Sequence, residues 1–134
     1  MPTPTLDAVG FVVTDMARTL AFYRLLGLDF PEGADNEGHV ETTLAGGIRL
    51  LFDTVAVIQS FSHYEPPAGG HRMGLAFRCV SPADVDAQFA ALIEAGETSL
   101  KEPFDAFWGQ RYAQVLDPDG NPVDLYAPLG VPTK

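Results

Sequence analysis

The chain repeats one pattern of secondary-structure signals in its two halves, and this repeat constrains the fold more than any other feature. Each half opens with an apolar run, residues 9–13 and 73–80, and a helix-start signal follows at once. Thr14-Asp15 and Ser81-Pro82 place short polar side chains where they can cap free backbone N–H groups. Two such copies predict two supersecondary units of the same kind.

The two predicted helices also match each other. Apolar positions recur along one face of each helix, at the 3.6-residue period. These positions are Thr19, Phe22, Tyr23 and Leu26 in the first half, and Val85, Phe89, Leu92 and Ile93 in the second. Gly27 and Gly96 follow the helices and favour left-handed C-terminal caps.

Two strands joined by a tight turn are expected after each helix. They cover residues 38–45 and 48–53 in the first half, and 109–116 and 122–127 in the second. Each half also has room for a short extra strand after its helix. Residues 61–71 contain two prolines and two glycines and are interpreted as a linker. We predict one domain over residues 1–134, with module one at about 5–60 and module two at about 72–128.

Each module is too small to bury its own sheet face, so the two sheets must combine. They can do so within one chain or by exchange between the chains of a homodimer. We therefore predict an α+β fold of paired βαβββ modules, whose curved sheets share a cleft. Clefts at module boundaries are favoured ligand sites.

Charge and cysteine content exclude several classes of protein. A net charge of −10 repels phosphate backbones and anionic lipids, so nucleic acid and membrane partners are not expected. The single cysteine, Cys79, lies in an apolar run and is interpreted as a small core residue rather than a catalytic thiol. The N-terminus has no basic segment followed by an apolar stretch, and we expect a cytoplasmic protein.

Several motifs resemble those of a known superfamily. Asp15, residues 20–23 (Leu-Ala-Phe-Tyr) and residues 26–28 (Leu-Gly-Leu) resemble the D…FY…LG signature of the vicinal oxygen chelate superfamily, which contains glyoxalases, bleomycin resistance proteins and dioxygenases. Residues 117–121, Asp-Pro-Asp-Gly-Asn, resemble its closing hairpin. The resemblance spans nearly the whole chain and implies the fold. It leaves the function open, because the superfamily holds metalloenzymes as well as metal-free antibiotic-binding proteins.

A narrower resemblance is to the mitomycin resistance proteins of this superfamily. It rests on residues 46–50, 69–72, 108–112 and 124–128. Those proteins are dimers that sequester a planar drug in a cleft between two chains. The resemblance implies that Trp108 and His39 line such a cleft here.

Metalloenzymes of this superfamily bind one divalent ion with four inward-facing His or carboxylate ligands, the groups that such ions accept. The resemblance places the first ligand position seven residues before Asp15. Aligning the two hairpins on Phe52 and Tyr126 gives the first-half position that corresponds to Asp124. The four positions hold Ala8, Leu50, Gly74 and Asp124. Only the last carries a donor atom, and the three histidines show no close ligand spacing. We expect no metal and no cofactor.

Trp108 and His39 are the first candidates for ligand contact. Trp108 is the only tryptophan and lies in the aromatic run 104–112, so it suits stacking on a planar ligand. The alternative is a core or interface tryptophan. His39 shares one face of a predicted strand with Glu41 and Thr43. It is either a cleft-facing imidazole or an exposed polar residue.

Four further residues complete the candidate set. Arg111 can offer donors to a carbonyl-rich ligand, although an arginine of this kind more often pairs with surface carboxylates. Phe52 and Tyr126 end matching strands and form either a stacking pair or part of the core. Asp124 has a structural role or contacts a polar group of the ligand.

The favoured function is sequestration of a planar aromatic small molecule, such as an antibiotic, by a metal-free homodimer. Binding alone lowers the concentration of a free toxin, so catalysis is not required, although the sequence does not decide whether the protein is an enzyme. One alternative is a metal-dependent enzyme of the glyoxalase or dioxygenase type. Another is an accessory protein of secondary-metabolite biosynthesis.

Overall fold

The computed structural model describes residues 3, 5–67 and 73–130, and the chain divides into two compact units. The first unit is Met1–Pro67 and the second is Ala68–Lys134. The division falls inside the predicted linker. His71 and the motif at residues 69–72 lie outside the described residues. Each unit is described by itself.

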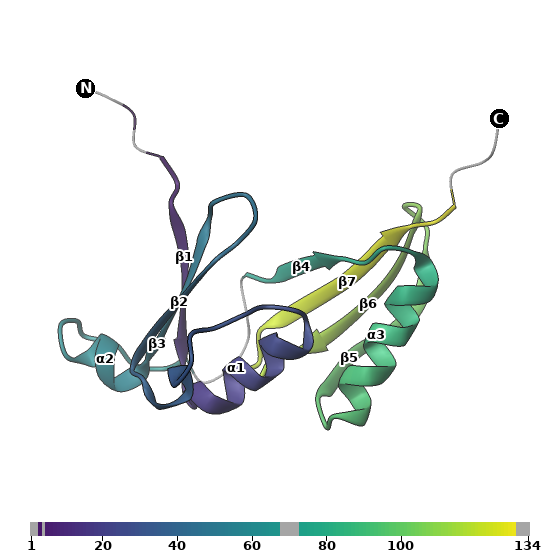
Figure 1. The fold of residues 1–134 in the computed structure, drawn as a ribbon. Coiled ribbons are helices and arrows are strands. Elements are labelled where there is room, and N and C mark those ends of the chain that lie inside the picture. The colour runs from purple at the N-terminus through teal and green to yellow at the C-terminus, as the bar shows by residue number, and fades with distance from the viewer. Residues whose placement is uncertain (1–2, 4, 68–72, 131–134) are drawn as a thin grey trace. The chain divides into compact units, whose positions relative to one another are not determined.

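The first unit is a three-stranded sheet with a helix on one face (Figure 1). Its elements are β1 (Ala8–Val13), α1 (Met16–Leu25), the 3-10 helix η1 (Ala34–Asn36), β2 (His39–Thr43), β3 (Arg49–Thr54) and α2 (Val55–Gln59). β3 lies between the other strands, parallel to β1 and antiparallel to β2.

Local sequence sets the ends of α1. The Asp15 carboxylate accepts the backbone N–H of Arg18 at 3.1 Å, which caps the helix. Gly27 follows the helix with φ of +94°, a conformation that only glycine adopts without strain. The helix packs its buried face, which includes Phe22 and Tyr23, against the sheet. The predicted cap and helix end are therefore confirmed.

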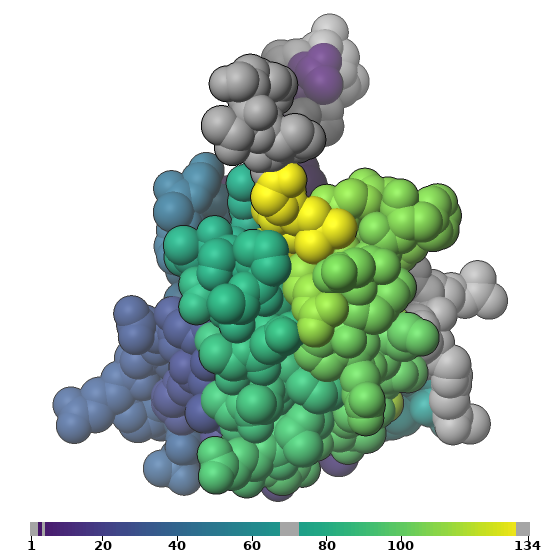
Figure 2. Space-filling model, turned by 90° about the vertical axis from the view of Figure 1, so that its right-hand side faces the viewer, coloured from purple at the N-terminus to yellow at the C-terminus, as the bar shows by residue number. Residues whose placement is uncertain are grey.

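The second unit repeats this plan with one more strand (Figure 1). Its elements are β4 (Leu75–Arg78), α3 (Pro82–Glu94), β5 (Thr98–Ala106), β6 (Gln110–Leu116) and β7 (Pro122–Pro128). The strands lie in the order β4-β7-β6-β5 across the sheet. β4 and β7, the first and last strands of the unit along the chain, are neighbours and parallel, as β1 and β3 are in the first unit. Figure 2 views this unit with α3 toward the reader, in teal to green. Ser81 caps α3 by accepting the backbone N–H of Asp84 at 3.2 Å.

The predicted α+β class and the paired modules are confirmed, with two differences in detail. The second unit has the complete βαβββ order, since the extra strand is β5. In the described part of the first unit, η1 occupies the place of that strand. The five-residue helix α2 was not predicted, because its signal is only the Thr54 cap, whose hydroxyl accepts the N–H of Val57.

The turn between β6 and β7 is held by Asp117, whose side chain is almost completely buried. One carboxylate oxygen accepts the backbone N–H groups of Asp119 and Asn121, each at 2.9 Å, and the other accepts the Asn121 side-chain amide. Gly120 supplies the left-handed residue of the turn, with φ of +85°. The Asp-Pro-Asp-Gly-Asn motif therefore fixes the turn after β6, and with it the register of β6 on β7.

Candidate ligand-binding surface

Alternation along β6 and β7 gives the second sheet two faces of different chemistry. Ala113, Val115 and Leu125 are buried on the face that α3 covers. The opposite face is here called the aromatic face. Its residues are Phe104, Gln110, Tyr112, Gln114, Asp124 and Tyr126, which are all partly exposed.

An aromatic cluster covers one end of this face, at the tip of the β5–β6 hairpin. Trp108 lies 5.3 Å from Tyr112 and 6.2 Å from Phe104 between ring centroids, and the ring planes are nearly perpendicular. Phe107 also packs against the indole, with 5.0 Å between ring centroids. Trp108 is 49% exposed and Phe107 is 97% exposed. The hairpin tip is the light green projection in Figure 2.

The backbone and one hydrogen bond hold Trp108 in place. The Gly109 N–H bonds to the Ala106 carbonyl at 3.0 Å, and Gly109 has φ of +92°, which closes the turn. The indole N–H donates to the Gln110 amide oxygen at 2.8 Å. With its only donor satisfied, the indole is oriented for ring contacts, and half of its surface is open to a ligand.

Asp124 lies beside the cluster in a hydrogen-bonded network. The Tyr112 hydroxyl donates to one of its oxygens at 2.6 Å, and the Gln114 amide donates to the other at 2.9 Å. Desolvation, followed by this hydrogen bond, raises the pKa of Tyr112 to about 12, so the hydroxyl keeps its proton at neutral pH. The network joins Trp108, Tyr112 and Asp124 into one continuous surface.

Arg111 lies on the other face of the sheet. Its guanidinium binds Asp86 of α3 at 2.9 Å and Asp105 at 3.0 Å. These ion pairs are the alternative that the sequence favoured for Arg111. Neighbouring residues of β6 point to opposite faces of the sheet, and Tyr112 is on the aromatic face. Arg111 therefore does not contribute to the aromatic face.

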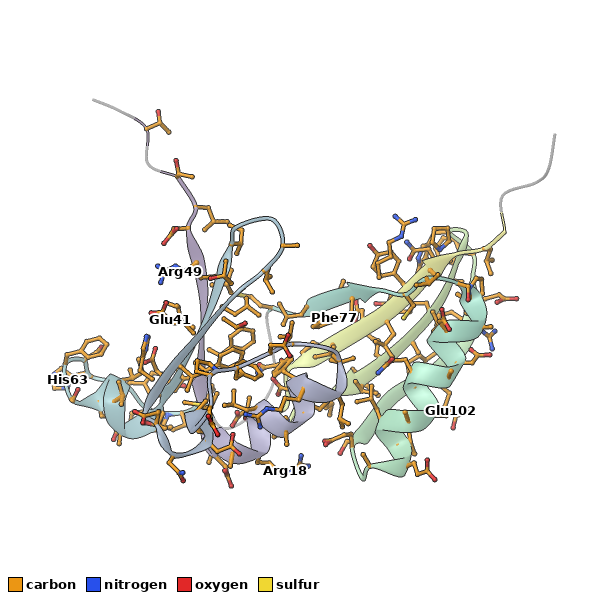
Figure 3. The ribbon with its side chains drawn as sticks, in the orientation of Figure 1. Arg18, Glu41, Arg49, His63, Phe77 and Glu102 are labelled. Atoms are coloured by element: carbon orange, nitrogen blue, oxygen red, sulfur yellow. The ribbon has the colours of Figure 1, made fainter. Side chains whose placement is uncertain are left out.

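The first sheet also carries a polar surface, here called the charged face and formed by His39, Glu41, Arg49 and Asp53. The His39 ring nitrogens bond to Asp53 at 2.5 Å and to Glu41 at 2.8 Å. Arg49 binds the other oxygen of Glu41 and the Asp7 carboxylate, each at 2.6 Å. Figure 3 shows Glu41 and Arg49 projecting from the same side of the sheet. His39 is thus engaged by two carboxylates.

We expect His39 to titrate above its ordinary pKa of 6.5, because the hydrogen bonds that its ring donates to Glu41 and then to Asp53 stabilise the imidazolium. A pKa raised by folding stabilises the folded state fully below the unfolded pKa. That contribution is lost as the pH rises through the folded value. An NMR titration of the His39 ring measures this directly. Glu41→Gln should move the midpoint back toward 6.5, and a wild-type midpoint at or below 6.5 would contradict the network.

Phe52 belongs to the core of the first unit and not to an exposed surface. It is fully buried and stacks on Phe11 at 4.8 Å, with Tyr23 and Phe30 against it. Of the two roles considered for Phe52 and Tyr126, the core role applies to Phe52. Tyr126 lies on the aromatic face, so the two residues do not occupy equivalent positions.

The strand register corrects the hairpin alignment by one residue. Phe11 pairs with Phe52 in the first sheet, as Phe77 pairs with Leu125 in the second. The first-half equivalent of Asp124 is therefore Leu51 and not Leu50, which is buried on the α1 side. Leu51 has no donor atom either. In the part of the chain that the structure describes, no group of three or more His, Cys, Asp and Glu residues could hold a metal ion.

Cys79 is half-buried rather than fully within the core. Burial, and then the nearby Asp84 carboxylate, raise the pKa of its thiol. A thiol with a raised pKa has little thiolate at neutral pH, which fits the expectation that Cys79 is not catalytic.

Four residues of the aromatic face were missed as candidates from the sequence: Phe104, Gln110, Tyr112 and Gln114. Period-two alternation along 110–114 could have grouped Gln110, Tyr112 and Gln114 with one another, since they are two residues apart along the strand. Their link to Asp124 needs the pairing of β6 with β7, which is a tertiary feature.

Comparison with known proteins agrees with this architecture. Residues 5–125 match the Glyoxalase/Bleomycin resistance protein/Dioxygenase superfamily, and the chain belongs to that superfamily. No curated protein matches the sequence. None of the helices in the described residues is long and apolar enough to cross a membrane.

Solved structures share the fold at low sequence identity. A glyoxalase/bleomycin resistance protein/dioxygenase family enzyme from Burkholderia phytofirmans PsJN superimposes with a TM-score of 0.77 at 22% identity, covering 94% of this chain and 100% of that chain. A glyoxalase-related enzyme from Fulvimarina pelagi gives 0.77 at 18% identity, with coverage of 98% and 96%. A protein from Agrobacterium tumefaciens, solved by NMR, gives 0.70 at 26% identity, with coverage of 96% and 100%.

Proposed function

We propose that this protein binds a planar aromatic small molecule, such as an antibiotic, on the aromatic face of the second sheet and sequesters it without chemical change. One observation carries the proposal: Trp108 is held by Gln110, is half exposed, and lies against the rings of Phe104 and Tyr112. Flat aromatic side chains offer large contact area at low entropic cost. The resemblance to mitomycin resistance proteins at residues 108–112 supports the same role.

The single tryptophan makes the proposal testable without labels. Titration with planar quinones or quinoxalines should quench Trp108 fluorescence saturably, because the ligand stacks against the half-exposed indole. A saturated polycyclic alcohol of similar size should not do so. If no planar compound quenches Trp108, or the saturated alcohol does so equally well, the proposal is wrong.

A metal-dependent enzyme of the glyoxalase or dioxygenase type is the second candidate, because the chain shares its fold with the glyoxalase-related enzyme from Fulvimarina pelagi. Against it, the four ligand positions hold Ala8, Leu51, Gly74 and Asp124, and only Asp124 supplies a carboxylate. Measuring how tightly the purified protein binds divalent zinc, nickel, manganese or iron distinguishes the enzyme from the metal-free binding protein. Binding of one ion per chain at micromolar concentration, lost in Asp124→Ala, would favour the enzyme.

We also propose that the protein acts as a homodimer. The resemblance to dimeric drug-binding proteins supports this, as do the exposed aromatic side chains Phe107 and Trp108 of the second unit. Sedimentation equilibrium should then give twice the chain mass of 14.4 kDa. A single species at 14.4 kDa over the micromolar range would contradict the dimer.

A further inference from the structure

The Asp124 carboxylate is fixed in position but has spare capacity to accept hydrogen bonds. Tyr112 donates to one oxygen and Gln114 to the other, so both ends of the group are oriented. An ionised carboxylate has roughly four lone-pair sites, and two protein donors leave about half of them open. The group is partly exposed, so a ligand can reach it.

The neighbours of Asp124 across the sheet differ in size. Its register partner on β6 is Gln114, whose amide already binds it. Its register partner on β4 is Ala76, an exposed residue with only a methyl side chain. The side of Asp124 toward β4 therefore has no long neighbouring side chain at the paired position.

Two polar groups at this edge of the aromatic face, the Tyr112 hydroxyl and the Asp124 carboxylate, present acceptor atoms to a ligand. The Tyr112 hydroxyl already donates its hydrogen bond to Asp124, so its oxygen can only accept a hydrogen bond from a ligand. The Asp124 carboxylate, when ionised, has acceptor atoms and no donor. The Trp108 N–H, the one donor on the adjoining indole, is used by Gln110. A ligand placed against Tyr112 and Asp124 thus meets acceptor atoms at this edge of the aromatic surface.

We propose that Asp124 selects planar aromatic ligands that carry an N–H or O–H donor at the ring edge, such as arylamines and hydroxylated quinones, over ring systems that carry acceptors only. This inference rests on the proposed function, since it names the substrate class of the same surface. Asp124 is a specificity-determining residue in it. Tyr112 and Gln114 position the carboxylate, and the rings of Trp108 and Phe104 supply the flat contact.

Three flat probes of nearly equal size test the proposal: anthraquinone, 2-methoxyanthraquinone and 2-aminoanthraquinone. They are neutral, so the charge of the protein does not bias the comparison. In the wild-type protein the amino compound should bind roughly fivefold to tenfold more tightly than the other two, as one hydrogen bond to a partly exposed carboxylate allows. Quenching of Trp108 fluorescence gives the three affinities.

Two variants of equal charge change show whether Asp124 causes the preference. Asp124→Asn should reduce the preference to about twofold or less. Glu94→Gln, on the exposed end of α3, should preserve it. The wild-type series by itself keeps the proposal falsifiable if Asp124→Asn fails to fold.

The outcomes separate the two proposals. An amino preference that Asp124→Asn removes and Glu94→Gln keeps supports the inference. Equal wild-type affinities for the three probes, or a preference that survives in Asp124→Asn, overturns the inference and leaves the proposed function standing. Failure of all three probes to bind overturns both.

Discussion

Replacing Phe52 with alanine should lower the free energy of unfolding of the first unit by about 3–5 kcal/mol, the usual cost of deleting a buried phenylalanine ring. Phe52 has no exposed surface and contacts three other aromatic rings, of which Phe11 is stacked on it in parallel. The cavity cannot close easily, because these rings come from β1, α1 and the segment after α1. Urea unfolding followed by far-UV circular dichroism measures the change.

Phe61→Ala is the matched control, because Phe61 is in the same unit but 73% exposed. Its effect should stay within about 0.5 kcal/mol, as for most surface substitutions. Trp108 fluorescence, followed in the same experiment, reports on the second unit alone, since that unit holds the only tryptophan. Equal losses in Phe52→Ala and Phe61→Ala would show that Phe52 is not part of a packed core.

Replacing Trp108 with alanine should weaken binding of a planar quinone by at least about tenfold, which corresponds to roughly 1.4 kcal/mol. The indole is the largest ring of the aromatic cluster, and its exposed half is the surface offered to the ligand. Trp108→Phe should recover part of the affinity, because a smaller flat face remains. Isothermal titration calorimetry is the suitable measurement, since both variants lack the fluorophore.

The fold of Trp108→Ala should be little affected, because the side chain is half exposed at a hairpin tip. Circular dichroism checks this before binding is compared. Phe61→Ala again serves as the control, now for the loss of an exposed aromatic side chain outside the second unit. An unchanged affinity in Trp108→Ala would remove the stacking model, whatever the behaviour of Asp124.

Local chemistry in the sequence determined where the helices begin and end. Asp15 and Ser81 accept backbone N–H groups at the starts of α1 and α3, and Gly27 and Gly96 take positive φ after them. These interactions span at most three or four residues, so a single sequence reveals them. The repeat of the pattern was enough to predict two similar units and the α+β class.

Strand faces were less accessible to sequence reasoning, because an error of one residue moves a side chain to the opposite face. The alignment of Phe52 with Tyr126 was one residue wrong. It matched Asp124 with the buried Leu50 instead of the partly exposed Leu51. Both residues are aromatic and lie two residues before the ends of β3 and β7, so composition could not separate them. Only the pairing of β1 with β3 and of β4 with β7 did so.

The repeat and the helix caps could thus be predicted from the sequence itself. The tertiary structure alone decided which side chains share a surface. Asp86 and Arg111 are 25 residues apart and still pair, which directs Arg111 toward α3. Tyr112 and Asp124 are 12 residues apart and meet on the opposite face. Such contacts depend on strand register and helix packing, which no local pattern specifies.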